Sequence, residues 1–168
     1  MLYPLSYGGS RCASSVHEGQ GRVIRGVSVM GADDTAATEP GYGRRALVVD
    51  DSPAVRDLVV VNLELEGFEV RSAADGQEGL EAATAWHPDV MTLDVVMPRL
   101  GGFEVLERLR ADPSTADIPV VIVTGRAQAA DRARGEALGV DAYLTKPFEP
   151  AELVAVVSEL ARTGRRYA

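Results

Sequence analysis

The segment Ala46–Val59, ALVVDDSPAVRDLV, joins a short apolar run to a helical pattern through two aspartates. Its first four residues are all apolar, which is typical of a β-strand buried on both faces of a parallel sheet. Ser52 and Pro53 follow, and serine before proline is a favoured start for a helix. Apolar residues then recur at helical spacing up to Leu65, and Gly67 supplies a residue suited to a helix end. The segment predicts a strand, an acidic turn and a helix.

The same strand-then-helix pattern recurs through the rest of the chain. Further strands are predicted at residues 68–73, 88–94, 118–125 and 141–146. Further helices are predicted at residues 76–87, 102–112, 127–139 and 149–164. Strict alternation indicates a parallel sheet with helices on both faces. We therefore predict one α/β domain at residues 44–163, a flavodoxin-like doubly wound (βα)5 fold with strand order 2-1-3-4-5.

The overall composition excludes several classes of protein. The chain has 168 residues and a formal net charge of -8, and an acidic balance argues against direct binding of nucleic acid. A single cysteine excludes an intramolecular disulfide framework and fits a reducing compartment. Neither a membrane-length apolar run nor a signal-peptide pattern is present in the sequence. We expect a soluble cytoplasmic protein with no membrane partner.

The first 43 residues differ from the rest of the chain. They are rich in glycine, serine, proline and threonine and lack a regular period, which predicts a disordered or linker-like extension. Residues 22–30, RVIRGVSVM, are a candidate short strand without an obvious pairing partner. An alternative hypothesis is that translation begins at Met30, which N-terminal peptide mass spectrometry of the native protein would decide. Residues 164–168 are expected to form a short tail.

Polar residues end four of the five predicted strands. Asp50 and Asp51 end the first strand, Asp94 the third, Thr124 the fourth and Lys146 the fifth. In a doubly wound sheet, ligands bind beyond the carboxyl ends of the strands, near the point where the strand order switches. We therefore expect three carboxylates, a hydroxyl and an ammonium group to face one crevice.

This combination of groups suits metal-assisted phosphoryl chemistry. Clustered carboxylates repel one another unless a cation joins them, and Mg²⁺ favours oxygen ligands. A carboxylate can attack phosphorus to form an aspartyl phosphate, and the transfer depends on positioning and charge neutralisation. Lys146 is the only lysine among 17 basic residues, so sixteen are arginine. A compact ammonium at this position suits contact with a single phosphoryl oxygen, whereas arginine presents a broad planar fork.

Each residue taken alone has an ordinary structural role as an alternative. An Asp51 or Ser52 side chain can cap the first helix, and Asp94 can cap the turn after its strand. Thr124 before Gly125 is common turn chemistry. The functional interpretation depends on the coincidence at four strand ends.

Four motifs resemble the receiver domains of bacterial two-component response regulators over about residues 44–163. They are ALVVDDSPAVRDLV, PDVMTLDVVMPRLGGFEVLERLR, IPVVIVTG and GVDAYLTKPFEPAELVAVV. The resemblance implies a phosphorylation-dependent signalling switch rather than a conventional enzyme. Its partner would be a histidine kinase or phosphotransfer protein. Only ARTGRRYA follows Leu160 in the last predicted helix, so we expect a stand-alone receiver that signals by protein–protein contact, on a target or as a phosphorelay intermediate.

The resemblance also implies a role for each site residue. Asp94 would accept the phosphoryl group from a phosphohistidine, and Thr124 and Lys146 would bind its oxygens. Asp51, Asp94 and the backbone carbonyl of Val96 would bind Mg²⁺, and Asp50 would hold metal-bound water. The Lys146–Pro147 peptide bond would be cis, as an X-Pro bond permits.

In the family's switch, phosphorylation draws Thr124 towards the phosphoryl group and Tyr143 turns inward. The readout surface would comprise the fourth helix, the fifth strand and the fifth helix. Many receivers dimerise there through charged pairs, but Ala142 and Val156 depart from that pattern, so we expect a monomer or weak dimer. Arg126 and Val96 flank the reacting centre and would tune its rates.

Two alternatives remain open at this point. A haloacid-dehalogenase-like phosphatase also combines aspartate, magnesium and lysine, but its nucleophile lies on the first strand with a second aspartate two residues on. The DDSP turn here lacks that pair. A pseudo-receiver or scaffold would bind partners without phosphorylation, although such domains usually lose one of the acidic or lysine positions, all of which this sequence retains.

Overall fold

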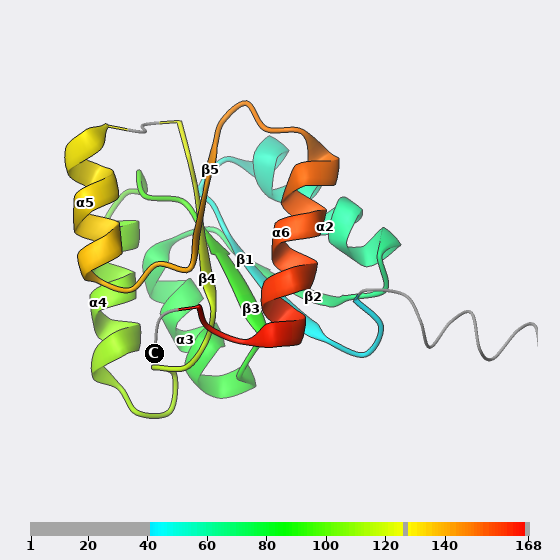
Figure 1. Ribbon diagram of the computed structural model, residues 1–168, viewed down its shortest axis with the longest axis horizontal. Helices are drawn as coiled ribbons and strands as arrows, with labels where there is room; N and C mark the ends of the chain where they lie inside the picture. Colours follow the sequence, from blue (N-terminus) through cyan, green and yellow to red (C-terminus); the bar gives the residue numbers. More distant parts are fainter. Residues whose placement is uncertain (1–40, 126–127, 167–168) are drawn as a thin grey trace, which may run out of the picture. The chain divides into compact units, whose positions relative to one another are not determined.

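The computed structural model describes residues 41–125 and 128–166, which form a five-stranded parallel sheet with helices on both faces (Figure 1). The strands are β1 Arg45–Val49, β2 Glu69–Ala73, β3 Val90–Leu93, β4 Val120–Thr124 and β5 Ala142–Thr145. The helices are α2 Pro53–Leu65, α3 Gly76–Trp86, α4 Gly102–Ala111, α5 Ala129–Ala137 and α6 Pro150–Thr163. The strand order is β2-β1-β3-β4-β5, so the predicted fold class and order are confirmed.

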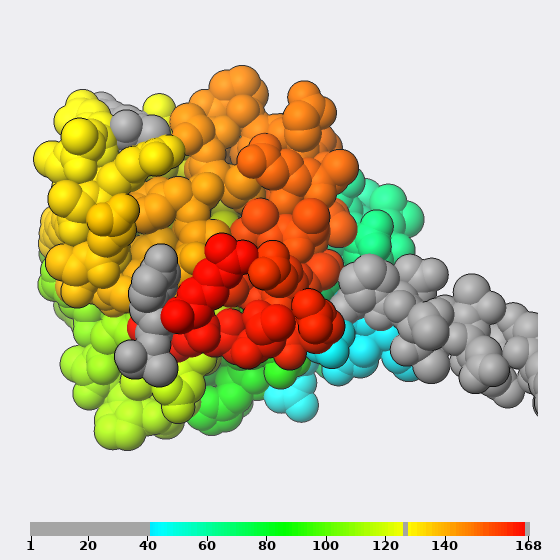
Figure 2. Space-filling view, viewed as in Figure 1, coloured from blue at the N-terminus to red at the C-terminus, as the bar shows by residue number. Residues whose placement is uncertain are grey.

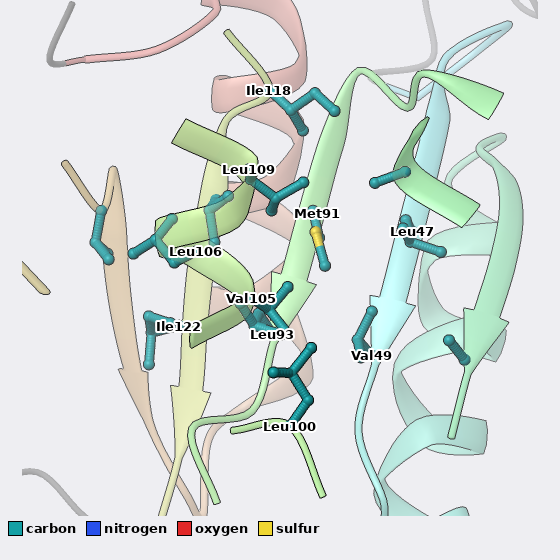
Figure 3. Close-up of a cluster of buried hydrophobic side chains, with 14 of the residues drawn as sticks. Leu47, Val49, Met91, Leu93, Leu100, Val105, Leu106, Leu109, Ile118 and Ile122 are labelled. Carbon is teal, nitrogen blue, oxygen red and sulfur yellow. The ribbon is translucent and has the colours of Figure 1, made fainter. Parts of the chain in front are cut away.

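Two apolar layers hold the helices to the sheet, because neighbouring residues of a strand point to opposite faces. Leu47 and Val49 of β1 pack in the layer that contains α3 and α4, as Figure 3 shows for part of this core. Ala46 and Val48 face the other layer, which contains α2 and α6. Strands β1, β3 and β4 are thus buried on both sides, which explains their continuous apolar sequences.

Local sequence signals predicted the helix ends to within a few residues of those in the structure. Pro53 begins α2, and Gly67 follows its end with a φ of 86°, a left-handed conformation that favours glycine. Ser52 stands at the N-cap position, as predicted, but its side chain makes no capping hydrogen bond. Its backbone amide instead donates to Asp50 Oδ1 at 2.9 Å, so the aspartate orders the turn.

Residues next to the predicted domain limits also contact the domain. The Gly41 amide donates to Glu66 O at 3.1 Å, although residues 41–43 were assigned to the extension. At the other end, the Arg166 amide donates to Asp141 Oδ1 at 2.8 Å. Figure 2 shows this C-terminal segment in red, on the surface beside α6. The described part of the chain contains no helix with the length and apolarity needed to cross a membrane.

The remaining predictions about local sequence fall outside the described residues. These are the extension at residues 1–40, the candidate strand at residues 22–30, the alternative start at Met30 and the role of Arg126.

Candidate functional site

The carboxyl edge of the sheet brings the predicted site residues together. Asp50 and Asp51 directly follow β1, Asp94 follows β3, Thr124 ends β4 and Lys146 follows β5. Their proximity follows from the parallel arrangement, in which all strands end at one edge. Asp50, Asp94 and Thr124 are buried, whereas Asp51 is exposed to solvent.

Lys146 is the centre of this cluster. Its Nζ donates to Asp50 Oδ2 and to Asp94 Oδ2, each at 2.7 Å, and its side chain is 20% exposed. The second oxygen of each carboxylate orders a turn, because Asp50 Oδ1 accepts from Ser52 N at 2.9 Å and Asp94 Oδ1 accepts from Val96 N at 3.1 Å. Asp94 thus orders the turn after its strand, as one of its two sequence alternatives predicted, and it also lies in the acidic cluster. Asp50, for which no turn role was predicted, orders the turn after β1 in the same way.

The carboxylates keep the lysine charged. Burial by itself would lower the pKa of Lys146, but the hydrogen bonds to Asp50 and Asp94 and their negative charges raise it above its usual value of 10.5. Because the folded-state pKa is raised, the stabilising contribution of the ammonium is complete below the unfolded-state pKa. It is lost only as the pH rises through the folded-state pKa. Lys146 is thus a cation throughout the physiological range.

Three carboxylates provide a donor set that fits a divalent cation. Asp50, Asp51 and Asp94 each offer one oxygen, and these oxygens all lie within 4.8 Å of one another. Hard oxygen donors of this kind suit Mg²⁺, which binds through a few carboxylates and retains several waters. The exposure of Asp51 leaves the cluster open to solvent on one side. The residues present therefore fit the ion that the sequence predicted.

The two predicted switch residues lie on the neighbouring strands β4 and β5 and make different contacts. The backbone carbonyl of Thr124 accepts from Lys146 N at 2.9 Å, which joins β4 to the end of β5. Tyr143 is outside the acidic cluster, and its hydroxyl donates to Asp131 O on α5 at 3.0 Å. Burial, followed by the charges of Asp131 and Glu136, raises the pKa of Tyr143. The Lys146–Pro147 peptide bond is cis.

Arg56 is a further cation at the site that the sequence pattern did not single out. It lies in the first turns of α2, and its Nη1 donates to the backbone carbonyl of Asp50 at 2.8 Å. This contact ties the helix to the acidic turn after β1. A basic residue five positions after an Asp-Asp pair was the only signal available, and arginine is frequent in this chain.

Comparison with known proteins identifies the family. Residues 46–158 match the family model of the response regulator receiver domain, and the chain belongs to this family. It is 46% identical over 122 residues to the DNA-binding dual master transcriptional regulator RpaA of Synechocystis, a match that covers 73% of this chain and 51% of RpaA. It is 45% identical over 129 residues to the transcriptional regulatory protein PrrA of Mycobacterium tuberculosis, covering 77% of this chain and 53% of PrrA. The chain thus spans about half the length of these curated relatives.

Solved structures of receiver domains show the same fold. The chemotaxis protein CheY4 of Vibrio cholerae superposes with a TM-score of 0.66 at 34% identity, covering 69% of this chain and 97% of CheY4. The receiver domain of a signal transduction histidine kinase from Syntrophus aciditrophicus gives a TM-score of 0.68 at 27% identity, covering 75% of this chain and 96% of that domain. The family and the flavodoxin-like fold predicted from the sequence are confirmed, and the phosphatase reading gains no support.

Proposed function

We propose that this domain is a phosphorylation-dependent signalling switch in a two-component phosphorelay, with Asp94 as the phosphoacceptor. The observation that carries this proposal is the position of Lys146 Nζ, 2.7 Å from both Asp50 and Asp94 at the ends of β1 and β3. A cation held between two carboxylates is suited to receive a phosphoryl group bonded to one of them. Membership of the receiver family supports the same role.

In the proposed reaction, a carboxylate oxygen of Asp94 attacks the phosphorus of a phosphohistidine on a histidine kinase or phosphotransfer protein. The new oxygen–phosphorus bond replaces the phosphorus–nitrogen bond, and the imidazole, already protonated on its other ring nitrogen, leaves as the neutral base. Lys146 neutralises one phosphoryl oxygen and the Thr124 hydroxyl donates to another. The domain would catalyse only its own phosphorylation and dephosphorylation.

Asp50, Asp51 and Asp94, with the backbone carbonyl of Val96, would hold Mg²⁺ at this site. The three carboxylate oxygens within 4.8 Å support the assignment. When bound, the ion supplies positive charge against the phosphoryl oxygens. Asp50 and Asp94 are oriented for this role by the amides of Ser52 and Val96, so little reorganisation of either carboxylate is needed.

The conformational response would pass through Thr124 and Tyr143. Phosphorylation would draw the Thr124 hydroxyl towards Asp94, and Tyr143 would leave its hydrogen bond with Asp131 O and turn inward. Such a response biases an equilibrium between two conformations that already exist. Because Tyr143 is hydrogen-bonded to Asp131 of α5, its movement would change the surface formed by α5, β5 and α6.

We infer that this surface contacts a downstream protein. The formal net charge of -8 over the full chain favours a protein partner over nucleic acid, although one relative is described as DNA-binding. Ala142 and Val156 place uncharged side chains on β5 and α6, which favours a monomer or a weak dimer. A location in the cytoplasm is part of the same proposal.

The proposed phosphoacceptor is tested by chemical phosphorylation. Incubation of the full chain with acetyl phosphate and Mg²⁺, followed by intact-mass analysis, should give one hydroxylamine-labile phosphoryl adduct. The adduct should be absent in Asp94→Asn and when Mg²⁺ is chelated. Asp57→Asn is a matched control, because Asp57 is an exposed aspartate on α2, and it should label normally. Equal labelling of Asp94→Asn would refute the assignment, and failure of the wild type to label would favour a pseudo-receiver.

A further inference from the structure

The loop between β3 and α4 contains an unusual backbone conformation at Arg99. Its φ is 68°, in the left-handed region that residues other than glycine, asparagine and aspartate rarely adopt. Among the described residues other than glycine, only His87 shares a positive φ, and it is the C-cap residue of α3, where this conformation is common. Arg99 has no such helix-end role. A residue held in a disfavoured conformation beside a functional site indicates that surrounding contacts impose it.

The contacts that hold Arg99 come from the start of α3. Arg99 Nη2 donates to Asp75 Oδ2, and the Asp75 side chain is only 4% exposed. The other oxygen of Asp75 accepts from Gln77 N at 2.8 Å and Glu78 N at 3.0 Å, so this carboxylate caps α3 and binds the loop together. A Cβ added at Gly76 would lie 2.4 Å from Leu100 O, which shows how closely the loop rests on the helix.

The same loop is bound to the phosphoacceptor at its other end. Leu100 is buried in one cluster with Val49 and Leu93, the residues that precede Asp50 and Asp94, and Figure 3 shows these three side chains close to the strand ends. A Cβ added at Gly102 would lie 2.1 Å from Asp94 O, and the Gly102 amide donates to Val95 O at 3.0 Å. The loop therefore has little freedom to move without moving the backbone of Asp94.

We propose that Arg99 is a positioning residue for the magnesium site, an inference that rests on the proposed function. The Arg99–Asp75 ion pair anchors the β3–α4 loop to α3. The loop in turn sets the orientation of the Asp94 carboxylate through the Val96 amide, which donates to Asp94 Oδ1 at 3.1 Å. It also sets the position of the Val96 carbonyl. Residues that orient metal ligands in this way commonly change metal affinity by about 10- to 100-fold when they are replaced.

An ordinary surface ion pair would behave differently. The Arg99 side chain is 73% exposed, and ion pairs with one such exposed partner contribute little to stability. If Arg99 acted only through stability, its loss would change the melting temperature slightly and leave Mg²⁺ affinity unchanged. Measurement of Mg²⁺ affinity and melting temperature on the same variants therefore distinguishes a role in positioning the magnesium site from a role in stability alone.

The test uses Arg99→Gln in the full chain, because glutamine tolerates a positive φ as poorly as arginine does and carries no charge to pair with Asp75. Isothermal titration calorimetry with Mg²⁺ should show a dissociation constant raised about tenfold, with a near-normal melting temperature. The Mg²⁺ concentration for half-maximal labelling by acetyl phosphate should rise in parallel, and the rate at saturating Mg²⁺ should change less. Arg99→Lys should bind Mg²⁺ more tightly than Arg99→Gln, because lysine can still pair with Asp75. Arg99→Gly should bind it as weakly as Arg99→Gln, because glycine relieves the unfavourable φ but leaves Asp75 without its ion pair.

Arg166→Gln is the matched control. Arg166 is likewise an exposed arginine with an ion pair, to Glu159 at 3.0 Å, and its replacement should leave Mg²⁺ affinity unchanged. If both Arg99→Gln and Arg99→Gly bound Mg²⁺ as tightly as the wild type, the inference would be overturned. The proposal that Asp94 is phosphorylated would be unaffected by that result. A weakened affinity that tracks a large drop in melting temperature, without rescue by lysine, would also overturn it. Absence of Mg²⁺ binding by the wild type would overturn the proposed function together with this inference.

Discussion

At the scale of single residues, Lys146 shows why this position does not follow the arginine preference of the chain. Its Nζ fits between two carboxylate oxygens at 2.7 Å from each, in a pocket where the side chain is 20% exposed. A single ammonium donates in three directions from one point, whereas a guanidinium spreads its donors over a rigid plane. We infer that this arrangement of the two carboxylates favours lysine over arginine.

We expect Lys146→Arg to separate charge from geometry. The variant should fold, because the positive charge opposite the carboxylates is kept. It should bind Mg²⁺, because the three carboxylates that would hold the ion are unchanged. It should lose most of the conformational change that phosphorylation drives, because the larger group cannot reach a single phosphoryl oxygen in the same way. Hydrogen exchange of β4, β5 and α5 with and without acetyl phosphate measures this change. Arg166→Lys is a control that exchanges the same residue types at the surface, and a normal response in Lys146→Arg would contradict the geometric argument.

At the scale of elements, β5 and α5 contact each other through Tyr143 and Gly135. The Tyr143 hydroxyl donates to Asp131 O, and a Cβ added at Gly135 would lie 1.6 Å from that hydroxyl oxygen. Gly135 thus provides the space in which the tyrosine ring lies against the helix. Tyr143, the proposed switch residue, can occupy its present position because residue 135 of α5 has no side chain.

Gly135→Ala should displace the tyrosine and cost about 1–3 kcal/mol in the free energy of unfolding, the usual range for overpacking. Urea denaturation measures this cost. In a Tyr143→Ala background the same substitution should become neutral or stabilising by about 0.5–1 kcal/mol, because alanine is the better helix former once the clash is removed. Gly125→Ala is a control, because a Cβ added there meets no described residue within 4 Å other than its own chain neighbours. Equal costs in both backgrounds would show that Gly135 acts independently of Tyr143.

At the scale of the whole molecule, Asp141 connects parts of the chain that are distant in sequence. Its Oδ2 accepts from Val120 N of β4 at 2.9 Å and from Arg110 of α4 at 3.3 Å, while Oδ1 accepts from Arg166 N at 2.8 Å. Arg165 lies beside Arg110 and pairs with Asp141 at 3.8 Å. Burial, together with the charge of Arg165, lowers the pKa of Arg110 to about 10 despite the opposing effect of Asp141.

Asp141→Asn should therefore be strongly destabilising. It leaves two mostly buried guanidinium groups without their shared counter-charge, and breaking a buried pair in this way costs about 3–5 kcal/mol. Urea denaturation should show this loss, and Arg165→Met in the same background should recover part of it because the repulsion between the arginines disappears. Glu159→Gln, which breaks an exposed ion pair with Arg166, should cost about 0–1 kcal/mol. Similar costs for Asp141→Asn and Glu159→Gln would contradict the proposed role of burial.

The sequence by itself determined the fold and most of the candidate site. Apolar runs such as ALVV alternate with helical patterns, and that alternation admits few arrangements other than a parallel doubly wound sheet. The carboxyl ends of parallel strands share one edge, so the polar residues at the ends of β1, β3, β4 and β5 could be placed together before any contact was known. These features are encoded by local order and spacing along the chain.

Only the tertiary structure decided which distant residues support the site and the domain. Several of these contacts are made by arginine, which occurs sixteen times in the chain. They are the contacts of Arg56 with Asp50, of Arg99 with Asp75, and of Arg110 and Arg165 with Asp141. An arginine side chain is long and flexible, so its position in the sequence does not reveal which carboxylate or carbonyl it reaches. The close approach of Gly135 to Tyr143 has the same origin, because it depends on how α5 packs against β5. Periodicity and strand ends are local properties, whereas these contacts exist only once the sheet and its helices have assembled.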